Sequence, residues 1–363
     1  MKIEILKIAD LIAFVESEKF NDSDEIPITR LRALSQAKNP RADADDIALL
    51  VATDESDNLL AYLGLLPDTL FVKNHPEKIW WVSCWWANEK VKTNAGIHLF
   101  YYASKELKGR IYLPELTPET KFLLEKIKTF ELLPIDCGIR GYLKLNLSTI
   151  LPAKKPKFAK WVGVLNIVDW CVNLLYKPVL WFWKMRLHKL KFDHSVENRI
   201  DHEAGQFIAK MNQNELFRRG ETELNWLIDN PWITNEKSAK MQQYAFTHEV
   251  QGYKMPVVRI TENGEIVAVY LLLMHNGKAI LTYSYYKQEV VGKVVETIFK
   301  LLLDNNIHTF TTFDEAISTS IKTRQNPFLF TKNQVKHFAF PRERREIVLQ
   351  GKIQHGDGDC AFV

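Results

Sequence analysis

The stretch that decides the fold runs from Lys78 to Ile127 and reads KIWWVSCWWANEKVKTNAGIHLFYYASKELKGRIYLPELTPETKFLLEKI. It opens with an apolar run from Ile79 to Trp86, which is typical of a buried strand. A polar loop follows, and then apolar side chains recur at helical spacing. A short strand-like run from Arg110 to Leu113 precedes a second amphipathic segment that starts at Pro118. The stretch therefore predicts a strand, a loop, a helix, a strand and a helix, in that order.

The loop that joins the first strand to its helix is a candidate binding site. Backbone N–H groups at the start of a helix point toward one place, and that arrangement suits a phosphate or a pyrophosphate. The predicted cofactor-binding residues of this loop are Lys90, Lys92, Thr93, Asn94, Ala95 and Gly96.

This unit resembles the core of the GNAT superfamily of N-acetyltransferases. In that superfamily the same loop holds the pyrophosphate of acyl-coenzyme A, usually with an Arg/Gln-x-x-Gly-x-Gly/Ala pattern. Residues 92–97 read KTNAGI, with one glycine and with Lys92 in place of the arginine or glutamine. The resemblance implies acyl transfer, with acetyl-CoA as the donor, to an amine, by direct attack on the thioester and without a metal.

The order of elements over residues 1–150 extends the resemblance. The pattern predicts a strand, a helix, three strands, a helix, a strand, a helix and further strands, which is the GNAT order. Three segments, RALSQAKNPRA (32–42), LLVATD (49–54) and YLGLLPD (62–68), are also similar to GNAT-like proteins of bacterial envelope and surface-polysaccharide pathways. That similarity implies an amino sugar of a polysaccharide precursor, such as a sugar nucleotide, as the acceptor.

The second half of the chain repeats this order. Two Asn-Gly dipeptides, at 263–264 and 276–277, lie between apolar runs and predict hairpins. A helix is expected over 287–306, a strand over 308–314 and a helix over 315–325. The pattern of Arg219, Leu224, Asn225, Trp226 and Pro231 also resembles the envelope-associated GNAT-like proteins.

We therefore predict an α+β protein made of two tandem GNAT-like domains, each a mixed, mainly antiparallel sheet flanked by helices. The expected domains are residues 1–150 and 195–345, with a hydrophobic helical linker at 151–194 and a tail at 346–363. In the second domain the loop that corresponds to residues 90–96 contains Gln288 and Gly292, which are further candidate cofactor-binding residues.

Acylation of an amine needs a base, and three carboxylates at strand ends are candidates for that role. They are Glu89, Glu115 and Asp314. Glu89 also suits a solvated loop position or the positive end of a helix dipole. Asp314 precedes a helix, so an N-cap role is the favoured interpretation for it.

Composition excludes several other classes of function. The chain has 363 residues, enough for two domains, and its net charge of +4 is too small to indicate a nucleic-acid partner. Its four cysteines lie far apart, which argues against a zinc site and fits a reducing cytoplasm. The first 20 residues lack the features of a signal peptide, and the charges throughout the sequence predict no transmembrane helix.

Two interpretations fit the apolar segment that begins at Trp161. In the first it is a linker helix wedged between two domains. In the second, residues 161–190 form an interfacial helix at the inner face of the membrane, with tryptophans at headgroup depth and basic residues against anionic lipid. Asn166, Asp169, Asn173 and Lys177 form one narrow polar stripe on this helix.

Two other functions remain open. The incomplete glycine patterns of both loops also suit a non-catalytic scaffold of envelope biosynthesis. Aminoacyl transfer from tRNA, as in the Fem-type tandem GNAT proteins, needs a basic face that the net charge does not favour. The tail contains Asp357-Gly358-Asp359, for which a turn followed by an edge strand is the favoured interpretation over a cation site.

Overall fold

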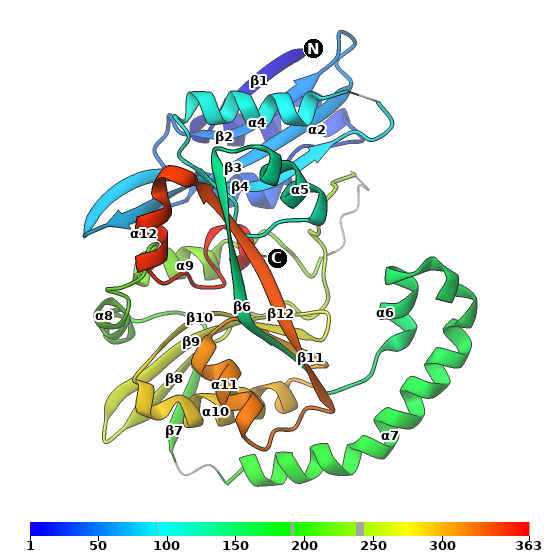
Figure 1. Cartoon of the computed structure of the whole chain (residues 1–363), viewed down its shortest axis with the longest axis vertical. Coiled ribbons are helices and arrows are strands. Elements are labelled where there is room, and N and C mark those ends of the chain that lie inside the picture. Colours follow the sequence, from blue (N-terminus) through cyan, green and yellow to red (C-terminus); the bar gives the residue numbers. More distant parts are fainter. Residues whose placement is uncertain (92, 190–191, 237–242, 363) are drawn as a thin grey trace. The chain divides into compact units, whose positions relative to one another are not determined.

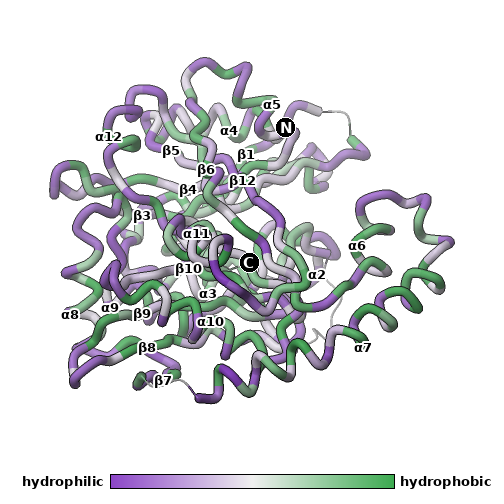
Figure 2. The backbone as a smooth tube through the Cα atoms, turned by 60° about the horizontal axis from the view of Figure 1, so that its bottom comes forward, coloured by the Kyte–Doolittle hydropathy of each residue, from purple (hydrophilic) through white to green (hydrophobic). Residues whose placement is uncertain are grey.

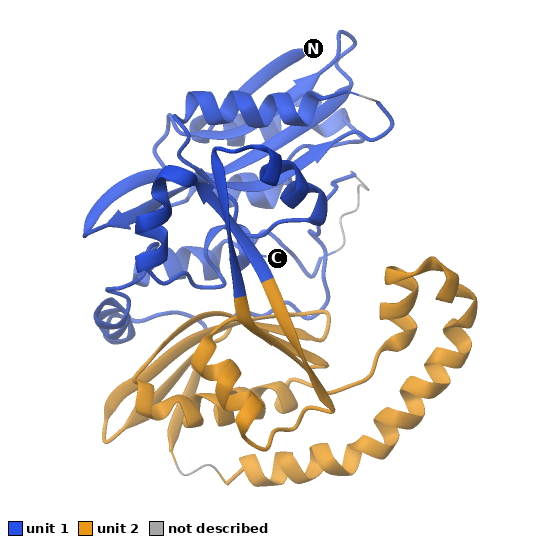
Figure 3. Ribbon diagram, in the orientation of Figure 1, with its two compact units in different colours: residues 1–135, 198–255, 336–363 blue, residues 136–197, 256–335 orange. Residues whose placement is uncertain are grey.

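The computed structural model describes residues 1–91, 93–189, 192–236 and 243–362 (Figure 1). The chain forms two compact units, each built from separate segments (Figure 3). Unit 1 comprises residues 1–135, 198–255 and 336–363, and unit 2 comprises residues 136–197 and 256–335.

Unit 1 contains a sheet of five strands in the order β1-β2-β3-β4-β5. Neighbouring strands are antiparallel, except that β4 and β5 are parallel. Its strands are β1 (Lys2–Lys7), β2 (Ile47–Thr53), β3 (Leu59–Val72), β4 (His75–Ala87) and β5 (Ile111–Tyr112). Its helices are α1 (Leu11–Glu16), α2 (Glu18–Asp22), α3 (Arg30–Ala37), α4 (Ala95–Glu106), α5 (Pro118–Lys126), α8 (His202–Met211), α9 (Glu221–Asp229) and α12 (Arg345–Gln350).

Helices cover both faces of the unit 1 sheet. Leu50 and Leu63 pack with Phe100 of α4 on one face, and Leu49 packs with Leu11 and other side chains of the α1–α3 region on the opposite face. Strands buried on both faces need apolar side chains at nearly every position. That requirement explains the uninterrupted apolar runs of β2, β3 and β4.

Unit 2 has a sheet of seven strands in the order β12-β6-β11-β10-β9-β8-β7. Its strands are β6 (Phe130–Tyr142), β7 (Asp193–Glu197), β8 (Val257–Glu262), β9 (Glu265–His275), β10 (Lys278–Tyr286), β11 (Thr309–Thr312) and β12 (Phe330–Pro341). β10 and β11 are parallel, whereas the pairs of β10 with β9, β9 with β8, β8 with β7 and β11 with β6 are antiparallel. Its helices are α6 (Leu147–Lys154), α7 (Val162–Leu187), α10 (Val291–Asp304) and α11 (Glu315–Thr323). The predicted class, α+β with two mainly antiparallel sheets flanked by helices, is confirmed.

Local chemistry explains the hairpins of unit 2. Asn263 and Gly264 connect β8 to β9, and Asn276 and Gly277 connect β9 to β10; all four residues have positive φ angles. Two successive left-handed residues are what a tight hairpin turn requires, and Asn-Gly adopts them at low cost. Both predicted hairpins are confirmed.

The two compact units do not coincide with the predicted domains, residues 1–150 and 195–345. The tandem arrangement of two GNAT-like domains stays a prediction. Residues 198–255 and 336–363 belong to unit 1, and residues 136–197, with the expected linker, belong to unit 2. The reason is the course of two long strands, because β6 and β12 each contain a boundary between the units.

One helix boundary was wrong. The sequence predicts a new helical piece at Pro178, but α7 runs from Val162 to Leu187 with Pro178 inside it. Proline lacks the N–H that would bond to the carbonyl of residue 174, so it favours bending. Figure 1 shows α7 as a long curved helix.

Candidate functional site

A fork between β4 and β5 is the structural basis of the candidate site in unit 1. The parallel pairing consists of Trp80 with Ile111 and Trp81 with Tyr112. β4 then continues to Ala87, whereas Leu113 exchanges two backbone hydrogen bonds with Ala339 of β12, at 2.9 and 3.0 Å. The chain after β5 therefore leaves β4.

A cavity of about 530 Å³ opens at this fork. Val82 to Trp85 of β4 form one wall, and residues 113–118 form another. The remaining lining residues come from the start of α3, from α5 and from two distant segments of the chain; they are Thr29, Arg32, Thr120, Trp232, Tyr244, Phe246, Thr247, Asp359 and Cys360. Its volume is in the usual range for a small-molecule site.

A β-bulge at Ser83 shapes the β4 wall. Gly64 of β3 faces Cys84 and Leu65 faces Val82, so that Ser83 is an extra residue on β4. A bulge bends its strand and redirects the side chain. Ser83 accepts a short hydrogen bond from the guanidinium of Arg32.

Arg32 lies almost fully buried at the cavity. Its Nη1 donates to the hydroxyl of Tyr244 at 2.9 Å, and its guanidinium carbon lies 4.0 Å from the ring centroid of Trp232. Thr29 caps α3 through the backbone N–H of Arg32, which fixes the start of this helix. The site thus contains a held positive charge in apolar surroundings.

Asp359 gives the cavity a carboxyl group with a raised pKa. It lines the cavity within the 3₁₀ turn η5 (Gly358–Ala361) and keeps partial exposure there. Burial raises the pKa of Asp359 to about 7, against the opposing effect of the Arg32 guanidinium, and Glu115 raises it further. A carboxylate with a pKa near 7 is suited to accept a proton at neutral pH.

The turn before Asp359 needs glycine. Gly358 has a φ of +74°, and a Cβ at this position would lie 2.9 Å from Pro114 and 3.1 Å from Trp81. Both the conformation and the close approach exclude larger residues. Gly358 thus allows the tail to lie where β4 and β5 separate, between Trp81 of β4 and Pro114 after β5.

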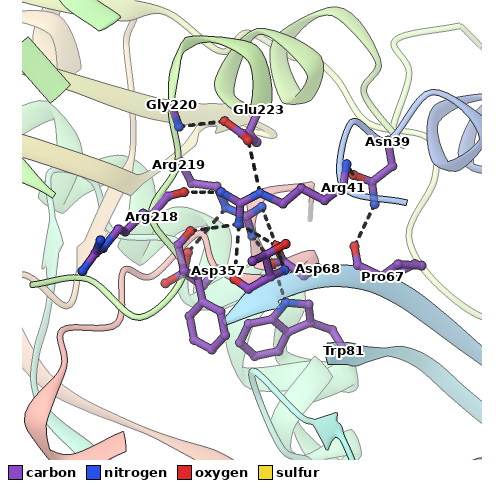
Figure 4. A network of polar contacts seen from close by, with 12 residues as sticks. Asn39, Arg41, Pro67, Asp68, Trp81, Arg218, Arg219, Gly220, Glu223 and Asp357 are labelled. Atoms are coloured by element: carbon purple, nitrogen blue, oxygen red, sulfur yellow. Dashed lines mark hydrogen bonds and ion pairs between the residues drawn. The ribbon is translucent and has the colours of Figure 1, made fainter. Parts of the chain in front are cut away.

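A buried charge network anchors the same tail (Figure 4). Asp68 accepts from Arg41 at 2.7 Å, from Arg219 at 2.5 Å and from the Trp81 indole at 2.7 Å. Arg219 also lies 3.8 Å from Asp357. Burial opposes ionisation of Asp68, but the two guanidinium groups outweigh it and lower the pKa of that carboxyl.

Two further carboxyl groups of this region are shifted toward the neutral form. Burial raises the pKa of Asp357 to about 6, although Arg219 opposes the shift. Burial, reinforced by the charge of Asp357, raises the pKa of Glu215 to about 8. Glu215 accepts a hydrogen bond from the Gln354 side chain at 2.7 Å, so it too holds the tail.

The structure brings one predicted residue of unit 1 into the cavity. Glu115 lines it. Glu89, Lys90, Thr93 and Asn94 are exposed on the loop before α4, outside the cavity lining, and Lys92 lies outside the described residues.

Ala95 and Gly96 are buried at the start of α4, and Gly96 has a packing role. A Cβ at Gly96 would lie 3.1 Å from the Trp85 indole nitrogen and 3.2 Å from the Ala87 methyl, while that indole donates to the Gly96 carbonyl at 2.9 Å. Trp85 therefore contacts both the loop and the cavity.

The three predicted residues of unit 2 make different kinds of contact. Gln288 lines a cavity of about 460 Å³ beside α11, and Gly292 packs under the Arg324 guanidinium. Asp314 caps α11 by accepting from the Ile317 N–H at 3.0 Å, which confirms the favoured N-cap interpretation.

Sequence reasoning missed most of the cavity. Arg32 begins the quoted segment 32–42, but the sequence assigned it no role; Trp232 and Tyr244 lie outside every quoted motif, and the fold brings the three together. The expected turn of the tail is present and the expected edge strand is not: a turn and the 3₁₀ turn η5 form, and no strand follows, since Asp357 and Gly358 are held inside unit 1. The available signals were the Asp357-Gly358-Asp359 sequence and the quoted segments that contain Arg32, Asp68 and Arg219, none of which had been assigned to a site.

The comparisons with known proteins give distant likenesses. No protein-family profile and no curated protein matches the sequence. N-myristoyltransferase of Saccharomyces cerevisiae with bound myristoyl-CoA is similar with 10% identity and a TM-score of 0.48, covering 93% of this chain and 82% of that chain.

Two further solved structures are similar to a comparable extent. A GCN5-related N-acetyltransferase from Anabaena variabilis has 9% identity and a TM-score of 0.45, covering 93% of this chain and 72% of that chain. The C-terminal domain of a putative lysylphosphatidylglycerol synthetase from Agrobacterium fabrum has 11% identity and a TM-score of 0.40, covering 94% and 95%. Likenesses at this level identify no activity, so the argument for function rests on the site itself.

Proposed function

We propose that this protein is an acyl-CoA-dependent N-acyltransferase that uses acetyl-CoA. The observation that carries the proposal is the fork between β4 and β5, which opens into a 530 Å³ cavity containing Asp359. The pantetheine arm of the donor lies along Val82 to Trp85, with its thioester in the cavity.

The place of the donor phosphates follows from the chain order. The loop of residues 88–94 leaves the end of β4 and enters α4, whose first N–H groups suit a pyrophosphate. Trp85 contacts Gly96 at this helix start and also lines the cavity. A donor held at the helix start therefore has a short path along β4 to the fork.

The chemical step is a direct transfer. The acceptor amine loses its excess proton to Asp359 and attacks the thioester carbonyl, whose oxygen takes a negative charge. The C–S bond then breaks as the nitrogen gives up a second proton to become the amide, and the coenzyme A thiolate takes that proton. A backbone N–H of β4 beyond Trp81 is the proposed donor to the oxyanion.

The acceptor that we propose is an amino sugar of a surface-polysaccharide precursor, presented on the cytoplasmic side. This choice comes from the sequence resemblance and from a base suited to an amine. The fork and Asp359 apply equally to other amines, so a panel of sugar nucleotides with free amino groups, simple amino sugars and amino acids tests it.

Donor binding is the first test. Calorimetric titration of the full chain with acetyl-CoA is expected to give micromolar binding with one site per chain. Leu116→Trp places an indole in the cavity and is expected to weaken binding at least tenfold. Leu349→Trp makes the same exchange on an exposed position of α12 and is the matched control.

The rival function is a non-catalytic scaffold. Wild-type protein that fails to bind acetyl-CoA, or that binds it equally well with Trp at position 116, contradicts the proposal. Binding without release of free coenzyme A thiol in the presence of every amine of the panel contradicts the transferase and leaves a binding protein.

A further inference from the structure

Helix α7 of unit 2 turns two of its polar residues, Asp169 and Asn173, toward residues 145–148. The Asp169 carboxylate accepts from the backbone N–H groups of Leu147 and Ser148, at 2.8 and 2.9 Å, and so caps α6. Asn173 accepts from the Leu145 N–H at 2.8 Å and donates to the Leu145 carbonyl at 2.9 Å. Asp169 and Asn173, the middle two residues of the polar stripe, are therefore bonded to backbone groups of unit 2, whereas Asn166 and Lys177 are exposed.

The inward face continues as an apolar seam. Tyr176 donates its hydroxyl to the Pro327 carbonyl at 3.2 Å, and Leu180, Trp183 and Leu187 pack on the core of unit 2. The inward residues lie at alternating intervals of four and three, which is one face of a helix; they are Asp169, Asn173, Tyr176, Leu180, Trp183 and Leu187.

The outward face of α7 is apolar and exposed, which inverts the usual pattern of a surface helix. Figure 2 colours much of α7 as hydrophobic. Of the most hydrophobic 18-residue window in residues 156–187, 6% is buried. The exposed fractions are 64% for Ile167, 65% for Trp170, 79% for Leu175, 66% for Trp181 and 60% for Phe182. A contiguous apolar surface of this kind marks an interaction site.

Charge indicates what covers this face. Between residues 151 and 189, Asp169 is the one acidic residue, and it is buried against α6. Exposed basic side chains precede the helix and follow its last turns; they are Lys154, Lys155, Lys157, Lys160, Arg186 and Lys189. Tryptophans at 161, 170 and 181 lie exposed along the same segment. Basic residues and tryptophans that flank an apolar face fit an anionic bilayer surface.

The internal contacts favour a helix that lies on the bilayer over one that crosses it. With 26 residues α7 is about 39 Å long, enough to cross a hydrocarbon layer of about 30 Å. However, Asp169 and Asn173 are bonded to residues 145–148 of the same unit. A crossing helix would carry those polar groups and the loop that they hold into the hydrocarbon, which is costly.

We propose that α7 docks this protein on an anionic membrane surface. Its outward side chains enter the boundary between headgroups and acyl chains, and the lysines of residues 154–160 contact lipid phosphates. The inward seam stays on unit 2, so binding requires no unfolding of the chain. The proposal is independent of acyl transfer.

Flotation of the full chain with vesicles tests it. We expect binding to vesicles of phosphatidylcholine mixed with phosphatidylglycerol, and at least tenfold weaker binding to phosphatidylcholine alone. Trp170→Glu/Trp181→Glu is expected to lower binding to the mixed vesicles at least tenfold. Phe122→Glu/Leu349→Glu, which changes two exposed apolar residues elsewhere, is expected to bind like the wild type.

Charge and depth are tested separately. The quadruple exchange of Lys154, Lys155, Lys157 and Lys160 to Gln is expected to reduce binding to mixed vesicles at least tenfold, and high salt is expected to release the wild type. Circular dichroism of each variant shows that it is folded.

Three results overturn the proposal. The first is a wild-type chain that does not float with mixed vesicles. The second is protein that resists extraction at high salt and alkaline pH, which would mean a crossing helix. The third is an oligomer that dissociates in Trp170→Glu/Trp181→Glu without any vesicle binding, which would make the outward face a contact between copies.

Discussion

The two units contain the same fork, and they differ in what fills it. In unit 1 the parallel pairing of β4 with β5 ends at Trp81, and a bulge follows two residues later at Ser83. In unit 2 the parallel pairing of β10 with β11 ends at Ile280, and a bulge follows two residues later at Thr282. Each pair is joined through one helix, α4 in unit 1 and α10 in unit 2.

Beyond the bulge the two forks diverge in chemistry. In unit 2, Asp314 accepts from the hydroxyls of Ser284 and Tyr286 of β10, at 2.8 and 2.6 Å, and so ties the strand to the segment after β11. In unit 1, a cavity containing Asp359 lies beside the bulge. The same arrangement of strands and bulge therefore borders a cavity in unit 1, whereas in unit 2 a carboxylate bridges it. We call the contacts of Asp314 with Ser284 and Tyr286 the clasp of unit 2.

The largest effect is expected from the open fork. Asp359→Asn removes the base and is expected to lower kcat/KM about 10²–10⁴-fold while the chain stays folded. In the wild type, kcat/KM should rise with pH through about 7, because Asp359 must lose its proton before it can accept one. The pH profile of thiol release by the wild type and the variant checks both points. A flat profile, or full activity in the variant, would show that Asp359 is not the base and that the forks of the two units do not differ in this way.

The next effect concerns the anchor of the tail. Asp68→Asn leaves Arg41 and Arg219 buried without their shared carboxylate and is expected to cost about 3–5 kcal/mol of unfolding free energy. Because Arg219 also contacts Asp357, activity should fall even where the variant is fully folded. Denaturant unfolding gives the first quantity. A higher KM with an unchanged kcat would show that Asp68 does not position Asp359.

The clasp of unit 2 is expected to contribute less. Asp314→Ala removes the α11 cap and both hydroxyl contacts, so it should cost about 1–2 kcal/mol of stability. Ser284→Ala/Tyr286→Phe keeps the cap and removes the contacts to β10. Denaturant unfolding of the double variant measures the contacts that close the fork, and its difference from Asp314→Ala measures the cap. A stoichiometry of two acetyl-CoA molecules per wild-type chain would mean that the clasp closes nothing.

A further effect, absent at acidic pH, is a pH dependence of stability. The folded pKa of Glu215, about 8, lies above the ordinary value of 4.5, so the folded chain binds the proton more tightly. The resulting stability is complete below the unfolded pKa and is lost as pH rises from about 4.5 through 8. Glu215→Gln should therefore match the wild type at acidic pH and melt at a higher temperature above pH 8. Equal melting temperatures of the two proteins above pH 8 would contradict the shift.

The sequence predicts what depends on neighbouring residues. Alternating and helical periodicity located the strands and helices, and Asn-Gly fixed two hairpins, because those signals act within a few residues. The Lys78–Ile127 stretch predicted β4, α4, β5 and α5 in order. The carboxylate of Asp314 was correctly interpreted as a cap, since its helix follows directly.

The candidate site is harder to predict because its parts are distant in the chain. Arg32 meets Tyr244 and Ser83 through contacts that span 212 and 51 residues. Asp359 reaches the fork because Arg219 and Glu215 hold the residues before it, and the local pattern that contains Arg219 does not show which residues it binds. The exposure of the α7 face was likewise undetermined, since a linker helix and an interfacial helix share one sequence pattern.

Unit 1 is built from three segments that are separated in the sequence, and this affects how it folds during biosynthesis. Its cavity is lined by residues as far apart as Arg32, Tyr244 and Asp359, so during translation Asp359 emerges after the last residue of unit 2. Domains tend to fold as they emerge, and exposed apolar surface in a waiting segment invites aggregation. Nascent β4, with its four tryptophans, is therefore a stretch that we expect to need protection from aggregation before the tail arrives.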